Sequence, residues 1–363
     1  MKVSVVLPIY NAAPFLKECL DSIISQTLTD IEIICENDGS TDNSLDILNE
    51  YASKDSRIKV FSHPNAGYGY SMNDGFSRAS GEYVGIVEPD DAIKPTMLEK
   101  LYNKAKEYDL DWIRGDIYLY YSHEQEESKR LVRESITWDN AYDRVLNPQN
   151  SFLPYKSGMR TWSGIYKLDF LKVHGINHNE TPGGSYQDVG FYLKTLYYAT
   201  KVYFLKEAFY MWRQDNPASS IHLNSKKLVE KSLTEWHLNY DYLNEHSELG
   251  KIARASYHYR KFYSYRWTLG LAEGIDKKTV VTAIKEEFSS AINNNEIDRR
   301  FYSDDEWMNF LKFLYENKIN VKQLDESFKT NTVLSKIGKL PMYVKTHGIL
   351  KTIKVCIKQI SGK

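Results

Sequence analysis

The chain has 363 residues, of which 42% are hydrophobic and 26% charged, with a formal net charge of −1. This composition is typical of a soluble globular protein of one or two domains, and the near-neutral charge argues against a nucleic-acid binder. Three scattered cysteines, Cys19, Cys35 and Cys356, argue against a disulfide framework or a zinc site and fit a reducing cytoplasm.

The first 108 residues alternate strand and helix patterns, which predicts an α/β fold with a mainly parallel central sheet. Strands are expected at 2–7, 31–35, 58–61 and 83–87, and helices at 14–24, 43–52, 69–79 and 95–108. Because open α/β sheets bind ligands beyond the carboxyl ends of their strands, the loops at those ends should form the site. From 109 to 214 the pattern loosens, and from about 224 onward it becomes helical.

A cluster of acids ends the fourth predicted strand. The apolar run 84–87 stops at three carboxylates, those of Glu88, Asp90 and Asp91. Like charges this close raise one another's pKa, so a neutralising cation is expected. Mg²⁺ or Mn²⁺ binds one or two carboxylates together with phosphate oxygens, which suits such a cluster. The alternative is an acidic strand-to-loop corner without a ligand.

Three further polar segments follow predicted strands. Alone, each segment is a weak signal. Gly39 permits a tight turn, and the polar residues beside it could cap the next helix. A glycine-spaced run before a helix could bring backbone N–H groups close to a phosphate. The segments contain Pro8-Ile9-Tyr10-Asn11, Asn37-Asp38-Gly39-Ser40-Thr41-Asp42, and Asn65-Ala66-Gly67 with Asn73.

In this order and at these spacings, the motifs resemble those of family 2 glycosyltransferases with the GT-A fold. That family shows Pro-x-Tyr-Asn, then Asp-Asp-Gly-Ser-Thr-Asp, then Asn-x-Gly…Asn, then Asp-x-Asp-Asp. The resemblance covers roughly residues 1–220. It implies a GT-A catalytic domain with a nucleotide-binding half at 1–108 and an acceptor half at 109–220, followed by a helical region at 221–363.

The resemblance also implies roles for individual residues. Asp38 is expected to recognise the nucleotide base, and Asp90 and Asp91, with Glu88, to hold a divalent metal (Mn²⁺ or Mg²⁺) on the donor diphosphate. Other expected donor contacts are Pro8, Tyr10, Asn11, Gly67, Asn73 and Arg213. Arg213 could equally form a surface ion pair. Asn37 and Glu88 stand where the family has Asp, which bears on base and metal preference.

The predicted catalytic base is Asp188, just before the apolar helix 189–198. The family reads Glu-Asp at this point and uses the Asp as base, whereas this chain reads Gln187-Asp188. The alternative is a helix N-cap, which Asp favours independently. Trp162 and Tyr166 match an aromatic stretch beside the family's acceptor site, although core packing explains them equally well.

The expected reaction is therefore inverting, metal-dependent transfer of a sugar from a nucleotide diphosphate, with a UDP-sugar as the expected donor. The expected acceptor is a saccharide or lipid-linked saccharide in surface polysaccharide synthesis. Inversion follows from one base and no evident carboxylate nucleophile. Two alternatives stay open: a nucleotidyl- or glycerophosphate-transferase, and an inactive carbohydrate-binding homologue, to which Asn37, Glu88 and Gln187 could point.

The tail, residues 336–363, carries seven lysines and no acid, with a stripe of isoleucines at 349, 353, 357 and 360. This pattern suits a helix on an anionic membrane surface, so we expect a cytoplasmic protein that can bind the inner membrane face. The alternative is a helix docked on the protein's own helical region.

Overall fold

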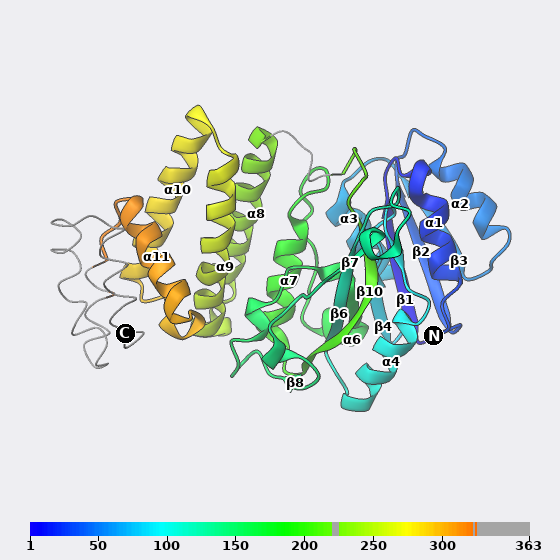
Figure 1. The fold of residues 1–363 in the computed structure, drawn as a ribbon, viewed down its shortest axis with the longest axis horizontal. Coiled ribbons are helices and arrows are strands. Elements are labelled where there is room, and N and C mark those ends of the chain that lie inside the picture. Colours follow the sequence, from blue (N-terminus) through cyan, green and yellow to red (C-terminus); the bar gives the residue numbers. More distant parts are fainter. Residues whose placement is uncertain (220–224, 322–323, 325–363) are drawn as a thin grey trace. The chain divides into compact units, whose positions relative to one another are not determined.

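The structure is a computed structural model that describes residues 1–219, 225–321 and 324 (Figure 1). The chain divides into two compact units, Met1–Ala272 and Glu273–Lys363. The expected basic tail at 336–363 lies outside the described residues.

The first unit contains one ten-stranded sheet, nine α-helices in its described part, and short 3₁₀ turns. The strands are β1 (Val3–Ile9), β2 (Ile31–Asp38), β3 (Ile58–His63), β4 (Tyr83–Ile86), β5 (Ala92–Ile93), β6 (Trp112–Tyr120), β7 (Leu131–Glu134), β8 (Val145–Leu146), β9 (Gly164–Lys167) and β10 (Val202–Arg213). The helices are α1 (Ala13–Ile24), α2 (Ser44–Ala52), α3 (Tyr68–Arg78), α4 (Met97–Tyr108), α5 (Glu127–Arg130), α6 (Leu168–Val173), α7 (Gln187–Tyr198), α8 (Ser225–Glu245) and α9 (Gly250–Leu271).

The main strands follow the order β3-β2-β1-β4-β9-β6-β10-β5. The first four are mutually parallel, β9 runs antiparallel between β4 and β6, and β10 is parallel to β6. The predicted α/β fold with a mainly parallel sheet is thus confirmed. Every residue of β1 and β2 is buried. The sequence of β1 is accordingly almost continuously apolar, whereas β2 also buries Glu32, Glu36, Asn37 and Asp38.

The segment from 109 to 214, expected to be irregular, contains two of the longest strands, β6 and β10. Their aromatic side chains pack on the sheet: Trp112 contacts Phe204 edge-to-face, and both are almost fully buried. Two register shifts in β10 interrupt its alternation, and this explains why a period-2 pattern was hard to see in the sequence.

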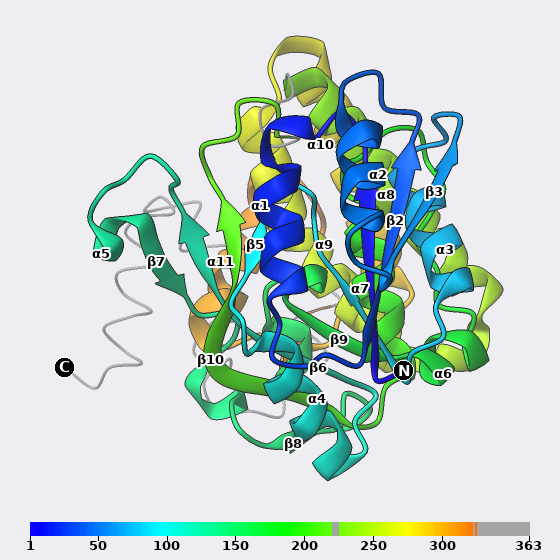
Figure 2. The same cartoon turned by 90° about the vertical axis from the view of Figure 1, so that its right-hand side faces the viewer.

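Helices cover both faces of the sheet (Figures 1 and 2). Helices α1 and α2 lie on one face, and α3 and α7 on the other. Helix α8 packs against α7, and α9 against α8, so both belong with the sheet although they fall in the predicted helical region. The α9 aromatics Tyr257, Phe262 and Tyr265 are buried.

The second unit contains α10 (Gly274–Asn293) and α11 (Asp304–Glu316). Phe288 of α10 contacts Phe310 and Phe313 of α11, and this aromatic cluster forms its core. Helix α11 begins with a capping box between Ser303 and Glu306. Across the described ranges, we find no helix with the length and hydropathy needed to cross a membrane.

Candidate active site

The loops after β1 and β2 are hydrogen-bonded to each other. Asn11 adopts a left-handed conformation (φ 51°), and its Oδ1 accepts from the Thr41 backbone N–H at 2.8 Å. The Asn11 N–H in turn donates to Ser40 Oγ at 3.0 Å. Tyr10 lies beside this junction with 53% of its surface exposed, while Pro8 is buried in β1. The structure thus brings these predicted donor residues to one edge of the sheet.

Asp38 holds the segment that leads into α3. Its carboxylate accepts from the backbone N–H groups of Ala66 at 2.6 Å and Gly67 at 3.0 Å. Gly67 has φ 94°, and a Cβ there would lie 3.1 Å from the Thr181 carbonyl oxygen, so glycine suits this close approach. The predicted contact between Asp38 and a base stays a prediction.

Helix α3 is bound to the loop that precedes α7, residues 177–186, which we call the base loop. Asn73 Nδ2 donates to the His178 carbonyl at 3.0 Å, and Asn73 Oδ1 accepts from the His178 N–H at 2.9 Å. The Tyr68 N–H donates to the Gly183 carbonyl at 3.1 Å. The described contacts of Asn73 are therefore structural, and its predicted donor contact stays a prediction.

The predicted metal ligands lie at residues 88–91, which we call the acid turn. Glu88 Oε1 accepts from the Tyr68 hydroxyl at 2.8 Å, and Asp90 Oδ2 accepts from Asn216 Nδ2 at 2.8 Å. Both side chains are half-buried, and each keeps one carboxylate oxygen without a hydrogen bond from the described residues. These two open oxygens could bind a cation.

Asp91 differs because both of its oxygens are occupied. Its Oδ2 accepts from the Tyr210 hydroxyl at 2.8 Å, and its Oδ1 from the Arg213 N–H at 2.7 Å. The Tyr210 hydroxyl also accepts from the Glu88 N–H at 2.9 Å. Asp91 is 2% exposed. In this arrangement Asp91 fixes the shape of the acid turn, and its predicted contact with a metal stays a prediction.

The charge within the acid turn is poorly compensated. Burial, together with Asp90 and Asp188, raises the pKa of Glu88 to about 8, despite the hydrogen bond from Tyr68. Burial and the Asp90 carboxylate likewise raise the pKa of Asp91 well above its usual range. A bound cation would relieve this repulsion, so the donor set fits a divalent metal with oxygen ligands.

Arg213 is buried beneath the acid turn. Its Nε donates to the Asp90 carbonyl at 2.6 Å, its guanidinium pairs with Glu18, and the side chain is 2% exposed. It lies over the ring of Tyr120. These contacts hold the Arg213 guanidinium against the backbone of the acid turn. The predicted contact of Arg213 with a diphosphate stays a prediction.

The predicted base, Asp188, stands in the first turn of α7. The N-cap position is Tyr186, so Asp188 is not the N-cap residue. Burial raises the pKa of Asp188 to about 6; Arg160 opposes this shift and Glu235 adds to it. Asp188 also contributes to the raised pKa of Glu88, after burial and Asp90.

The two predicted acceptor residues differ in environment. Trp162 packs against Tyr210, with ring centroids 4.2 Å apart, and is 9% exposed. Tyr166 is 2% exposed, donates its hydroxyl to the Thr161 carbonyl at 2.7 Å, and packs on Phe191. Tyr166 therefore belongs to the core, and Trp162 lies next to the tyrosine that holds the acid turn. Their acceptor roles stay predictions.

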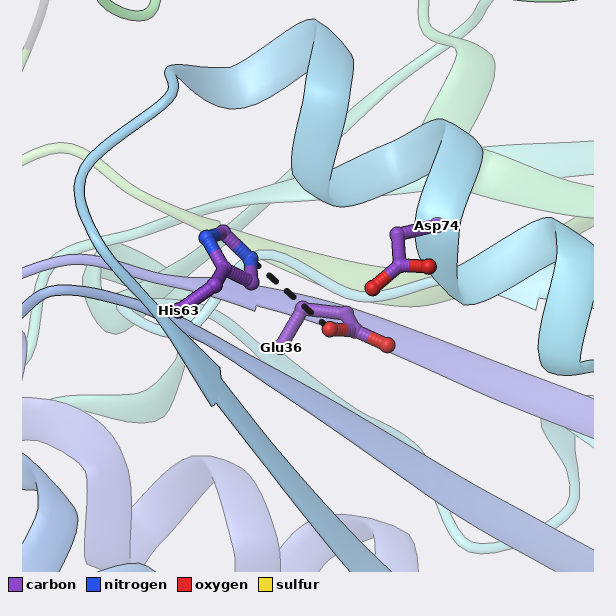
Figure 3. A group of neighbouring side chains, drawn as sticks. All are labelled: Glu36, His63 and Asp74. Carbon is purple, nitrogen blue, oxygen red and sulfur yellow. Dashed lines mark ion pairs between the residues drawn. The ribbon is translucent and has the colours of Figure 1, made fainter.

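A second group of possible metal ligands, Glu36, His63 and Asp74, lies near the end of β2 (Figure 3). Their ligand atoms all lie within 4.8 Å of one another. Burial and Asp74 raise the pKa of Glu36 to about 7. However, Arg78 Nε lies 3.3 Å from Glu36, and its guanidinium also pairs with Asp74 at 2.9 Å. Because an arginine already compensates these acids, the group fits a cation less well than the acid turn does.

Several residues of the site were not predicted from the sequence. Tyr68, Tyr210 and Asn216 donate to the acid turn, and Arg160 and Glu235 act on Asp188. Tyr210 and Asn216 flank the predicted Arg213 in sequence, so proximity to that residue was the one available signal.

Comparison with known proteins supports a single family. A family model described as "Glycosyl transferase family 2" matches residues 4–163. A cholesterol galactosyltransferase of Borreliella burgdorferi is 30% identical over 300 residues, which cover 80% of this chain and 82% of that protein.

The fold also resembles that of solved structures. The crystal structure of S. aureus TarS 1-349 matches with a TM-score of 0.58 and 22% identity, covering 100% of this chain and 92% of that one. The same protein in complex with UDP-GlcNAc matches with a TM-score of 0.53 and 19% identity, covering 100% and 93%.

Proposed function

The chain belongs to glycosyl transferase family 2 and is a glycosyltransferase, and on this premise we propose that it transfers a sugar from a UDP-sugar to an acceptor hydroxyl with inversion. The observation that carries the proposal is that Tyr68 links the acid turn to the base loop: its hydroxyl donates to Glu88 Oε1 at 2.8 Å, and its backbone N–H donates to the carbonyl of Gly183, five residues before Asp188. An inverting transfer needs a base on the acceptor side and compensation of charge on the donor side.

Asp90 and Glu88 are the residues that would hold a divalent metal, since each has an open oxygen. Asp91 would keep them in place through Tyr210 and the Arg213 N–H. When bound, the metal supplies positive charge for the departing diphosphate. Mn²⁺ or Mg²⁺ fits these oxygen ligands.

Asp188 would accept the proton of the acceptor hydroxyl as that oxygen attacks the anomeric carbon. Its raised pKa, about 6, leaves it mostly deprotonated at neutral pH yet more basic than an exposed aspartate. No residue of this chain needs to form a covalent bond with the sugar. The anomeric configuration should therefore invert.

We further propose a saccharide or lipid-linked acceptor, used in surface polysaccharide synthesis at the cytoplasmic membrane face. The similar protein named cholesterol galactosyltransferase makes a sterol a reasonable additional acceptor to test. The UDP-GlcNAc complex of the structural relative makes UDP-sugars the first donors to test.

The experiment incubates the full chain with UDP-, GDP- and CDP-sugars in Mn²⁺, Mg²⁺ or EDTA, with and without saccharide, lipid-linked saccharide and sterol acceptors. We expect release of UDP that stops in EDTA and a product of inverted configuration by NMR. Asp90→Asn should lose metal-dependent turnover. Release of pyrophosphate would instead indicate nucleotidyl transfer, and no turnover of any donor would indicate an inactive homologue.

A further inference from the structure

Helix α8 is connected to the base loop by one face. Lys231, Glu235 and Asn239 recur at a spacing of four residues and therefore share that face. Lys231 Nζ donates to the Pro182 carbonyl at 2.8 Å. A Cβ on Gly190 of α7 would lie 2.6 Å from Asn239 Oδ1, so the two helices approach closely. Glu235 lies between these two contacts.

Glu235 is a buried carboxylate, and its hydrogen-bond donors among the described residues both come from the base loop. It is 1% exposed. One oxygen accepts from Asn179 Nδ2 at 2.8 Å, and the other accepts from the Thr181 hydroxyl. A carboxylate this buried is tolerated only when it is hydrogen-bonded, so the base loop and α8 depend on each other.

Gln187 binds the same threonine from the other side. Its Nε2 donates to Thr181 Oγ1 at 2.9 Å and to the Gly183 carbonyl at 3.0 Å, and its Oε1 accepts from the Ser185 N–H at 2.6 Å. The Thr181 hydroxyl therefore receives a hydrogen bond from Gln187 and donates one to Glu235. This chain of hydrogen bonds ends at the residue next to Asp188.

The amide at position 187 is the side chain that this arrangement requires. A carboxylate there has no N–H to donate to Gly183 or to Thr181. It would also place a second negative charge close to Glu235 and to Asp188. This chain thus has Gln187 where the family has Glu, and it has an acid, Glu235, on α8 that accepts from the same threonine.

We infer that Glu235 is a positioning residue, which acts through Thr181 and Gln187 to hold the base loop and so to orient Asp188 toward the acceptor. The inference rests on the proposed function of Asp188 as the base. It makes α8 part of the catalytic apparatus.

Glu235 also acts on Asp188 electrostatically. Several groups surround Asp188: Arg160 lowers its pKa, Glu235 raises it, and Asp188 itself raises the pKa of Glu88, Tyr68, Tyr166 and Tyr186. Removing the charge of Glu235 should therefore lower the pKa of Asp188. This shift reports the charge of Glu235 near Asp188, whereas the activity of the exchanged variants below reports its positioning role.

The first test compares Glu235→Gln with Glu230→Gln, the same change at an exposed position of α8. We expect Glu235→Gln to lower kcat about tenfold or more, with a smaller change in KM, and to move the acid limb of the pH profile to lower pH. Glu230→Gln should match the wild type. Carboxyl ¹³C NMR titration of Asp188 measures the same pKa shift without turnover.

The second test exchanges the acid and the amide. Gln187→Glu alone should lose activity and move the acid limb to higher pH. Adding Glu235→Gln should restore activity by roughly tenfold, as expected for directly coupled residues. Circular dichroism confirms that each variant is folded. If Glu235→Gln alone does not fold, the comparison of Gln187→Glu with the double variant decides.

The inference is overturned if the double variant is no more active than Gln187→Glu, or if the pKa of Asp188 is unchanged in folded Glu235→Gln while the wild type is active. If the wild type turns over no donor, the proposed function fails separately. The NMR titration then still decides whether Glu235 acts on Asp188.

Discussion

Asp188 is the residue whose replacement best separates binding from chemistry. Asp188→Asn keeps the size of the side chain but cannot accept the hydroxyl proton, so transfer should fall by about 10²–10⁴-fold. Donor binding, measured by calorimetry with UDP, should stay within a few-fold of the wild type. A variant that kept more than roughly a tenth of wild-type turnover would contradict the role of base.

The wild-type pH profile provides a matching check. Because the pKa of Asp188 is raised to about 6, the base is protonated below that pH and kcat/KM should fall with decreasing pH. The acid limb should be lost in Asp188→Asn. If Asp188→Asn still shows an acid limb in its pH profile, that limb comes from another titratable group.

Tyr210 is predicted to stabilise the acid turn through one hydroxyl. Tyr210→Phe removes the hydrogen bond to Asp91 and leaves the Glu88 N–H without its partner. A buried polar group that loses its partner costs about 1–3 kcal/mol of unfolding free energy. Urea unfolding should show this loss, whereas Tyr121→Phe, whose hydroxyl makes no described hydrogen bond, should stay within about 0.5 kcal/mol.

The residue scale also shows what the sequence could and could not predict. Asp38, Asp90, Asp91 and Asp188 could be selected as candidates because each follows or begins a recognisable element, and their roles stay predictions. Their hydrogen-bond partners were not, because they come from distant segments: Tyr210 lies 119 residues beyond Asp91. Burial and pairing of Arg213 likewise depend on tertiary packing that motif spacing does not encode.

At the scale of elements, the contact between α3 and the base loop is tight enough to test. A Cβ on Gly69 would lie 2.0 Å from the Asn179 carbonyl oxygen. Gly69→Ala should therefore force the two segments apart and lower the unfolding free energy by about 1–3 kcal/mol, with reduced turnover.

The control is Gly270→Ala in α9, where a Cβ would meet no atom within 4 Å. Alanine favours a helix by up to about 1 kcal/mol over glycine, so this variant should be neutral or more stable. Equal effects of the two changes in thermal unfolding would show that the α3 contact is looser than described.

Element prediction worked where the pattern was local. Apart from the two-residue strand β5, the strands and helices before residue 108 were predicted within a few residues, because short apolar strands alternate with amphipathic helices. β6 and β10 were not. In β6 the charged residues Arg114 and Asp116 are buried, and in β10 aromatic residues on both faces and two register shifts hide the alternation.

At the scale of the molecule, the chain combines an α/β unit that extends through α9 with a second, helical unit that contains α10 and α11. The active site as proposed needs only the first. The second unit can therefore have a separate role, and the composition of the tail that follows α11 suggests membrane binding.

The last prediction concerns that tail, residues 336–363, which lies outside the described residues. Its seven lysines without an acid should attract anionic lipids by roughly 1 kcal/mol per well-placed lysine, and this attraction should weaken as salt rises. A membrane-bound enzyme would meet lipid-linked acceptors more often. The full chain should therefore sediment with vesicles that contain phosphatidylserine at low salt, and a chain ending at Ser335 should not. Vesicles of phosphatidylcholine alone are the control for charge. If both chains sediment alike, or neither sediments, the tail does not bind membranes.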